Sequence, residues 1–184
     1  MSGHATQYTL TPVAQKFILH WGEMGTRWGI NRTVAQVHAL LFVAPKPLPA
    51  DEISTTLAVA RSNVSTSLRE LQGWGIVRVV HVLGDRRDHF ESIKDVWEIF
   101  RIVSEERKRR EIDPTLQAIR ECVAELKANP QADAYTRERL ESMLEFLTAM
   151  TGLFEEIMRM PAGALKSVVK LRGKVVTLLG KKAG

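Results

Sequence analysis

Short hydrogen-bonding side chains and arginines gather on one side of residues 61–71, opposite a set of apolar residues. Val64, Leu68 and Leu71 recur at helical spacing and predict the buried face of a helix. Ser62 is a suitable N-cap for this helix. The side chains left to face outward are Arg61, Ser62, Asn63, Ser65, Thr66 and Arg69. Because the DNA major groove, about 12 Å wide, admits one helix, these residue types predict contact with base edges of double-stranded DNA.

A predicted β-hairpin follows this helix directly. Residues 76–83 are rich in β-branched side chains, and residues 89–93 return as a second strand after a polar turn at 84–88. Arginine is the favoured side chain for the DNA backbone and the narrow minor groove. We therefore expect the hairpin to contact DNA beside the helix, through Arg86, Arg87 and His89.

The elements that must position these residues are mainly helical. Residues 48–59 predict a short helix, which with residues 61–71 makes a helix-turn-helix. Upstream, Thr11 and Pro12 predict the start of a helix that ends near Trp28, and Asn31 caps a further helix that must end before Pro45. The predicted fold class is mainly α with a small β-hairpin wing: a winged helix-turn-helix plus long dimerisation helices.

Beyond the hairpin the sequence predicts only helices, the longest over residues 132–160. Apolar residues recur along it at near-heptad spacing, namely Leu140, Leu144, Leu147, Phe154 and Met158. We expect a second subunit to bury this stripe, so that the protein is a homodimer. The predicted domains are an N-terminal helix that contributes to dimerisation (1–30), the winged helix-turn-helix (31–94) and a helical dimerisation and regulatory region (95–184).

Charge and composition limit the classes of function. The net charge is +5, divided as +3 over residues 1–94, −5 over 95–158 and +7 over 159–184, and a basic chain attracts polyanions. The chain has no signal-peptide pattern and no apolar run long enough to span a membrane, so a cytoplasmic location is expected. Its five histidines lack metal-ligand spacing, its one cysteine excludes an intrachain disulfide, and no catalytic arrangement is present. We expect no enzyme activity, no metal and no cofactor.

Two further features leave alternatives open. Trp21, Trp28 and Trp97 either form an aromatic cage for a quaternary ammonium effector or anchor the core. A last helix is predicted after Pro161, and its lysines favour packing on a partner subunit over lying on a membrane. The alternatives to DNA binding are accordingly a winged-helix protein–protein adaptor and a membrane-surface protein that uses the basic C-terminal helix.

Residues 8–115 resemble the GbsR branch of the MarR-type regulators. The resemblance is carried by five segments: 48–59, 62–71, 74–77, the hairpin Gly84-Asp85-Arg86-Arg87-Asp88-His89-Phe90, and Arg109-Arg110-Glu111-Ile112-Asp113-Pro114. The last two segments are the more specific, because many regulators share the helix-turn-helix core. The resemblance implies a homodimer that is made by terminal helices and binds a pseudo-palindromic operator. It also implies repression that small molecules, such as choline or related osmolytes, can tune.

Overall fold

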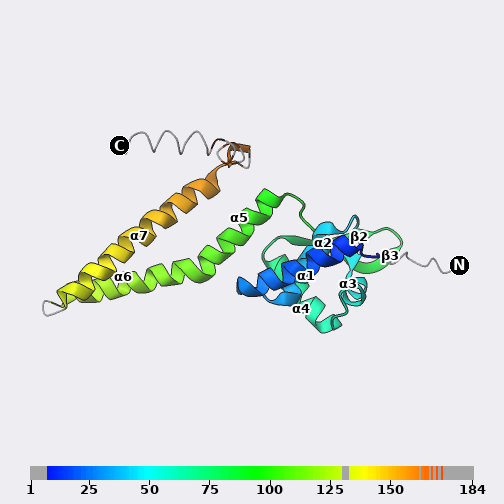
Figure 1. The fold of residues 1–184 in the computed structure, drawn as a ribbon, viewed down its shortest axis with the longest axis horizontal. Coiled ribbons are helices and arrows are strands. Elements are labelled where there is room, and N and C mark those ends of the chain that lie inside the picture. Colours follow the sequence, from blue (N-terminus) through cyan, green and yellow to red (C-terminus); the bar gives the residue numbers. More distant parts are fainter. Residues whose placement is uncertain are drawn as a thin grey trace. The chain divides into compact units, whose positions relative to one another are not determined.

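The computed structural model describes residues 8–129, 133–161, 163–165, 167, 169 and 171. These residues fall into two compact units, one that extends to Ile102 and one that begins at Val103 (Figure 1). The first unit contains, in chain order, α1 (Pro12–Arg27), α2 (Arg32–Val43), β1 (Leu48–Pro49), α3 (Ala50–Leu57), α4 (Arg61–Gly73), β2 (Val77–Val82), β3 (Asp85–Ser92) and the start of α5 (Val96–Arg107). The prediction of a mainly α fold with a small β-wing is confirmed.

Helix α2 forms the centre of the first unit. Its Val37, Ala39 and Leu40 are completely buried, and α1, α3, α4 and the sheet pack around it. The core also contains the apolar residues predicted for the helix-turn-helix, among them Ile53, Val64, Leu68 and Leu71. Both predicted starts are confirmed, since Thr11 and Asn31 cap α1 and α2 with their side chains. Burial of these apolar side chains therefore holds α3 and α4 in place against α2.

Helix α1 packs on α2 through two glycines. A Cβ atom on Gly25 would lie 2.5 Å from the Cβ of Ala35, so the two helix backbones approach closely at this point. The buried face of α1 consists of Ile18, Gly22 and Gly25. Val13 and Trp21, which recur at helical spacing in the sequence, lie outside this face and are exposed.

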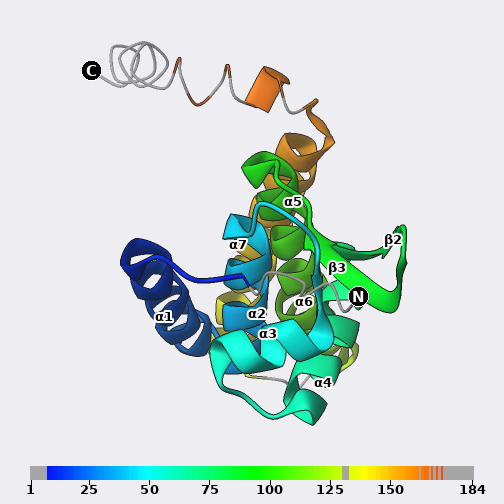
Figure 2. The same ribbon diagram turned by 90° about the vertical axis from the view of Figure 1, so that its right-hand side faces the viewer.

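Helices α3 and α4 form the helix-turn-helix, with Ala58 in the left-handed conformation (φ 51°) between them (Figure 2). The prediction that Ser62 caps α4 is wrong. The helix begins at Arg61, two residues earlier than an N-cap at Ser62 would allow, and its N-cap Ala60 offers no side-chain hydrogen bond. Ser62 is consequently a first-turn residue that faces solvent.

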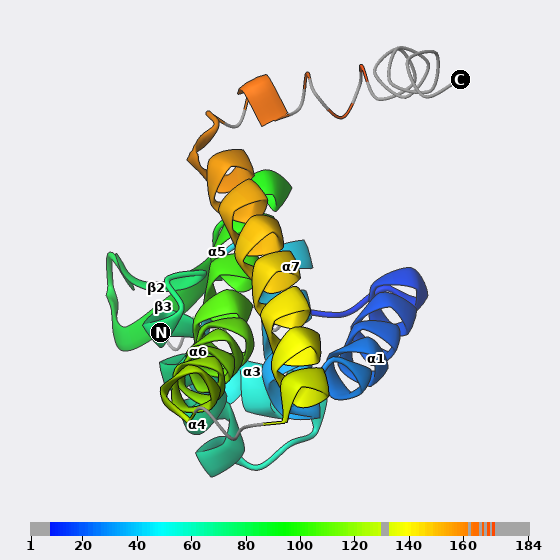
Figure 3. The same cartoon turned by 90° about the vertical axis from the view of Figure 1, so that its left-hand side faces the viewer.

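The wing belongs to a three-stranded antiparallel sheet in the order β1-β3-β2. A tight turn at Leu83 and Gly84 joins β2 to β3, and Gly84 takes the positive φ of 86° that this turn needs. The predicted turn at 84–88 is therefore wrong, because Arg86 and Arg87 lie within β3. Strand β1 was not predicted. Figure 3 shows α1 and the β2–β3 hairpin on opposite sides of this unit.

Lys94 and Asp95 lie between the wing and α5. The Lys94 ammonium donates hydrogen bonds to the backbone oxygens of Leu41 (2.7 Å), Phe42 (2.7 Å) and Ala44 (3.1 Å), and so satisfies carbonyls at the end of α2. Asp95 Oδ1 accepts from the Trp97 amide at 2.8 Å, at the start of α5. One residue therefore caps the end of α2, and the next supports the beginning of α5.

The second unit contains the last turn of α5, a π-helix η1 (Lys108–Ile112), α6 (Asp113–Ala128) and α7 (Ala134–Arg159). Helices α6 and α7 run antiparallel side by side (Figure 1). Lys108 links three elements of this unit, because its ammonium contacts Asp113 at 2.8 Å and Glu155 of α7 at 3.1 Å. The predicted long helix at 132–160 corresponds to α7, while the lysines of the predicted last helix lie outside the described residues.

Helix α7 has two apolar sides. The stripe identified in the sequence is half-buried at Leu140, Leu144, Leu147 and Phe154 and buried at Met158, within this single chain. A second stripe remains exposed and consists of Met143, Phe146, Met150 and Leu153, which are 51, 62, 48 and 50% exposed. In the described part of the chain, every helix is too short or too polar to cross a bilayer.

Candidate nucleic-acid interface

The solvent side of α4 carries all six of its residues that the sequence predicted to contact DNA. Arg61, Ser62, Asn63, Thr66 and Arg69 are exposed, and Ser65 is half-buried. This division follows from the burial of Val64, Ser67, Leu68 and Leu71 on the opposite side. The structure therefore brings the six side chains onto one helix surface that a groove of DNA could receive.

A cavity of about 440 Å³ separates α4 from the wing. Its lining comes from α3, α4, β1 and β3 and includes Arg61, Ser65, Arg69, Gln72, Arg87 and Asp88. Residues 61, 65, 69 and 72 are spaced by four, four and three positions, which places them along one side of the helix. The wing-facing side of α4 thus carries two arginines and two neutral hydrogen-bonding groups.

Gln72 is a site candidate that sequence reasoning missed. It is exposed, and it lines the same cavity as Arg61 and Ser65. It lies beyond the first turns of the helix, where base contacts were expected. Its helical spacing from Arg61 and Ser65 could have identified Gln72 from the sequence.

The side chains of Arg61 and Arg69 make no ion pair or hydrogen bond to any residue in the described ranges. Their guanidinium groups therefore keep all of their donors for an outside partner, and guanidinium matches both phosphate oxygens and the edge of guanine.

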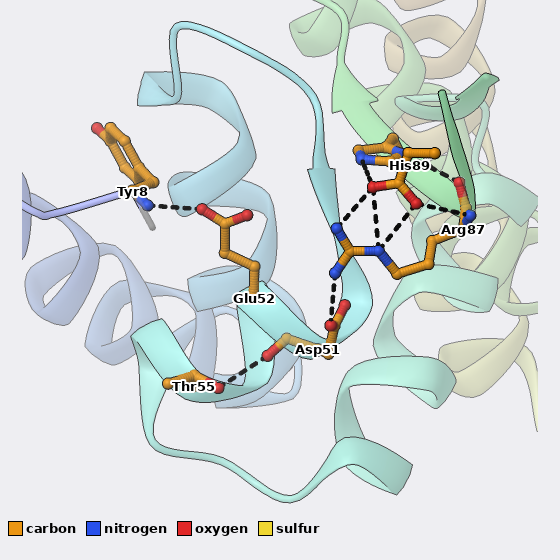
Figure 4. A network of polar contacts seen from close by, with 7 residues as sticks. Tyr8, Asp51, Glu52, Thr55, Arg87 and His89 are labelled. Carbon is orange, nitrogen blue, oxygen red and sulfur yellow. Dashed lines mark hydrogen bonds and ion pairs between the residues drawn. The ribbon is translucent and has the colours of Figure 1, made fainter. Parts of the chain in front are cut away.

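The two wing arginines have different surroundings. The side chain of Arg86 is exposed and makes no hydrogen bond or ion pair within the described part of the chain. Arg87 contacts two carboxylates: its Nη2 lies 2.6 Å from Asp85 Oδ2, and its Nη1 lies 2.7 Å from Asp51 Oδ2 (Figure 4). These hydrogen bonds raise the pKa of Arg87 and hold the pKa of Asp85 well below its usual range. Desolvation raises the pKa of Asp51, but the hydrogen bond from Arg87 contributes to a net lowering.

His89 is placed differently from the other predicted DNA-contacting residues, since only 6% of it is exposed. Its Nδ1 lies 2.9 Å from the backbone oxygen of Arg87, and its Nε2 lies 3.4 Å from Asp85 Oδ2. The ring therefore lies beside the Asp85 carboxylate and the backbone of Arg87 (Figure 4).

The three tryptophans considered for an effector cage lie on α1, at its C-cap and on α5. Trp21 is 38% exposed with its ring 5.4 Å from that of Phe17, Trp28 is 52% exposed, and Trp97 is half-buried. The second unit has its own cavity of about 440 Å³, lined by residues of α5, η1 and α7. Neither this cavity nor the one beside α4 is lined by any of the three tryptophans.

Comparison with known proteins supports the resemblance seen in the sequence. Residues 28–88, which include α2, α3, α4 and the tip of the wing, match the model of the MarR family. The chain is 25% identical over 100 residues to the HTH-type transcriptional repressor GbsR of Bacillus subtilis (strain 168), an alignment that covers 54% of this chain and 55% of that protein. The chain thus spans about half the length of the curated relative it matches.

A solved structure described as a transcriptional regulator shares the fold. It superposes with a TM-score of 0.62 at 22% identity and covers 80% of this chain and 96% of that one. Together with the helix-turn-helix and the three-stranded wing, the family model and the similarity to GbsR confirm the resemblance: residues 28–88 fold as a winged helix-turn-helix and match the MarR family, in a chain similar to a GbsR repressor.

Proposed function

We propose that this protein is a transcriptional regulator, acting as a repressor, that binds double-stranded DNA as a homodimer on a pseudo-palindromic operator. The observation that carries the proposal is the wing-facing side of α4, where Arg61 and Arg69 are exposed and have no partner among the described residues. The similarity to a GbsR repressor supports the same conclusion.

Helix α4 enters the major groove, and the wing lies against the adjacent backbone. Arg69 or Arg61 can bind the O6 and N7 atoms of a guanine in a bidentate manner, which is the commonest specific contact. Asn63 offers the carboxamide that adenine recognition uses. Repression then follows from occupancy, because a protein bound over a promoter excludes the polymerase.

The exposed stripe on α7 supports the homodimer. Its members are seven residues apart, 143 to 150 and 146 to 153, which is the spacing of a helix that packs against a second helix. A two-fold dimer presents two copies of α4 to one face of DNA, about 34–36 Å apart. That separation accounts for a palindromic operator.

Control by a small molecule is a separate part of the proposal. Trp21 of α1 and Trp28 at its C-cap are seven residues apart, and both are partly open to solvent. A quaternary ammonium compound could bind such faces by cation–π attraction. It would regulate only if it bound the DNA-competent and DNA-incompetent states with different affinity.

Selection of bound sites from random duplexes tests the central proposal. The wild-type chain should enrich one sequence with two half-sites. Arg69→Ala should flatten the preference at particular positions, because one bidentate pairing with a base contributes about 1–3 kcal/mol of discrimination. Arg120→Ala, which removes an exposed arginine of α6, is the matched control and should leave the preference unchanged. Enrichment of no site at all would favour a protein–protein adaptor.

A further inference from the structure

The last turn of α2 needs a hydrogen-bond donor from outside the helix. In a continued α-helix the carbonyl of Leu41 would accept from the amide of Pro45, but proline has no N–H. The Lys94 ammonium supplies a donor instead, since its Nζ lies 2.7 Å from the carbonyl oxygens of both Leu41 and Phe42 and 3.1 Å from that of Ala44. Its positive charge also lies at the negative end of the α2 dipole. Lys94 is therefore bound to a part of the chain that is distant in sequence.

The residues on either side of Lys94 also make defined contacts. The Ile93 amide donates to the carbonyl oxygen of Ile76 at 3.0 Å, and the Ile93 side chain packs against the core. Asp95 Oδ1 accepts from the Trp97 amide at 2.8 Å and so supports the first turn of α5. These three consecutive residues, which we call the junction, thus connect the end of the wing, the end of α2 and the beginning of α5.

Helix α5 has little packing of its own within this chain. None of its residues is buried, and Val96 and Phe100 in its first turns are 60 and 50% exposed. Ile102 packs against the core, at the boundary between the two units. The direction in which α5 begins therefore depends largely on the junction. Because α5 continues without a break into the second unit, that direction matters for everything that follows it in the chain.

We propose that Lys94 is a positioning residue for DNA binding: it holds the beginning of α5 to the end of α2, and so sets the separation of the two α4 helices that the homodimer presents to its operator. This inference rests on the proposed function. It deepens that function by assigning two kinds of specificity to two places. The base preference within a half-site belongs to α4, and the preferred distance between half-sites belongs to the junction.

Operators that differ only in the distance between their half-sites test this role. One base pair more or fewer moves a half-site by about 3.4 Å and turns it by about 35°, so the wild type should bind such operators about tenfold more weakly than its selected one. Lys94→Met keeps the apolar stem and removes the ammonium, and should reduce this preference to about threefold or less, because three hydrogen bonds to a charged donor are lost. Base preferences within each half-site should not change. Lys94→Arg should recover part of the spacing preference, and the milder Lys94→Gln should give an intermediate loss.

Two control variants separate positioning from loss of charge and from loss of stability. Lys16→Met removes the same charge from an exposed lysine of α1, whose side chain has no hydrogen bond or ion pair among the described residues. Ile53→Val removes one methyl group from the core at α3, and so lowers stability without changing the junction. Both controls should keep the spacing preference of the wild type. An unchanged preference in Lys94→Met, or an equal loss in Ile53→Val, would overturn the assignment.

Amide hydrogen exchange distinguishes failure of the junction from failure of the proposed function, because it needs no DNA. If the wild-type chain binds no duplex, the DNA-binding proposal fails, and the hold of Lys94 on α5 is then judged from exchange at residues 97–102. Faster exchange there in Lys94→Met, with exchange in α4 unchanged, supports the role of the junction. Equal exchange in the variant and the wild type overturns it.

Discussion

His38 should make folding sensitive to mild acid. Its side chain lies on α2 with only 7% of the residue exposed, and its Nε2 has no hydrogen-bond partner in the described part of the protein. Burial, reinforced by the positive charge of Lys94, lowers the pKa of His38 from 6.5 to about 4. Between these values the unfolded chain binds a proton that the folded chain excludes, so stability is complete above about pH 6.5 and falls as the pH decreases toward 4.

At about 1.4 kcal/mol per pH unit, the interval from 6.5 to about 4 corresponds to a loss of about 3 kcal/mol. The perturbation is His38→Leu, which keeps an apolar side chain in the core and removes the titration. Urea unfolding, followed by circular dichroism at a fixed protein concentration between about pH 4 and pH 7, measures the free energy of unfolding of both proteins. The wild type should lose about 3 kcal/mol more than the variant over this range. Parallel pH dependences for the two proteins would refute the reasoning.

Lys94→Met provides an internal check on the same mechanism. The substitution removes a charge that opposes protonation of His38 in the folded protein, so the folded-state pKa should move back toward 6.5 and the total acid-induced loss should be smaller than in the wild type. It also removes three hydrogen bonds to the end of α2, so stability at neutral pH should fall as well.

Other variants test the packing, the assembly and the effector. Gly25→Ala should lower the free energy of unfolding by about 1–3 kcal/mol in urea, because the new methyl group would lie 2.5 Å from the Cβ of Ala35. A variant as stable as the wild type would show that α1 can shift freely. Phe146→Glu should give monomers in analytical ultracentrifugation and weak operator binding. Thr148→Glu adds the same charge on the opposite side of α7 and should remain dimeric. Equal behaviour of the two variants would exclude the exposed stripe of α7 from the dimer interface. Choline should quench tryptophan fluorescence and change operator affinity, and Trp28→Ala should abolish both effects. A wild type whose fluorescence and operator affinity do not respond to choline would exclude this effector.

Local chemistry made much of the fold predictable from the sequence. Thr11 and Asn31 cap the first two helices as expected, because capping depends on a side chain and the two or three amides that follow it. The same rule failed at Ser62, because α4 begins two residues earlier, after Ala60, without a side-chain cap. The polar residues 84–88 resembled a turn by composition, but Gly84 with its positive φ allows a two-residue connection and leaves residues 85–88 in a strand.

The candidate site was predictable in its residue types and less so in its contacts. Helical spacing placed Arg61 and Arg69 on the solvent side of α4, and the structure has both there. The partnership of Arg87 with Asp51 depends on how β3 meets α3 across 36 residues, which no local pattern encodes. Burial of His89 likewise follows from the three-stranded sheet, in which it pairs with Pro49 of the unpredicted strand β1.

The π-helix η1 absorbs one extra residue in the second unit. A π-helix bonds each residue to the fifth along the chain instead of the fourth, so one turn holds more residues than a turn of an α-helix. One residue added to a continuous α-helix would turn everything downstream by about 100°. In the wider turn of η1 each residue rotates the chain less, so the segment from Lys108 to Ile112 turns it about as far as an α-helical segment that is one residue shorter. Deletion of one residue there should therefore restore a regular helix and leave the buried Leu116 and Val123 of α6 facing nearly their present direction. The wide turn thus allows the number of residues before α6 to change without changing which side of α6 packs on α7.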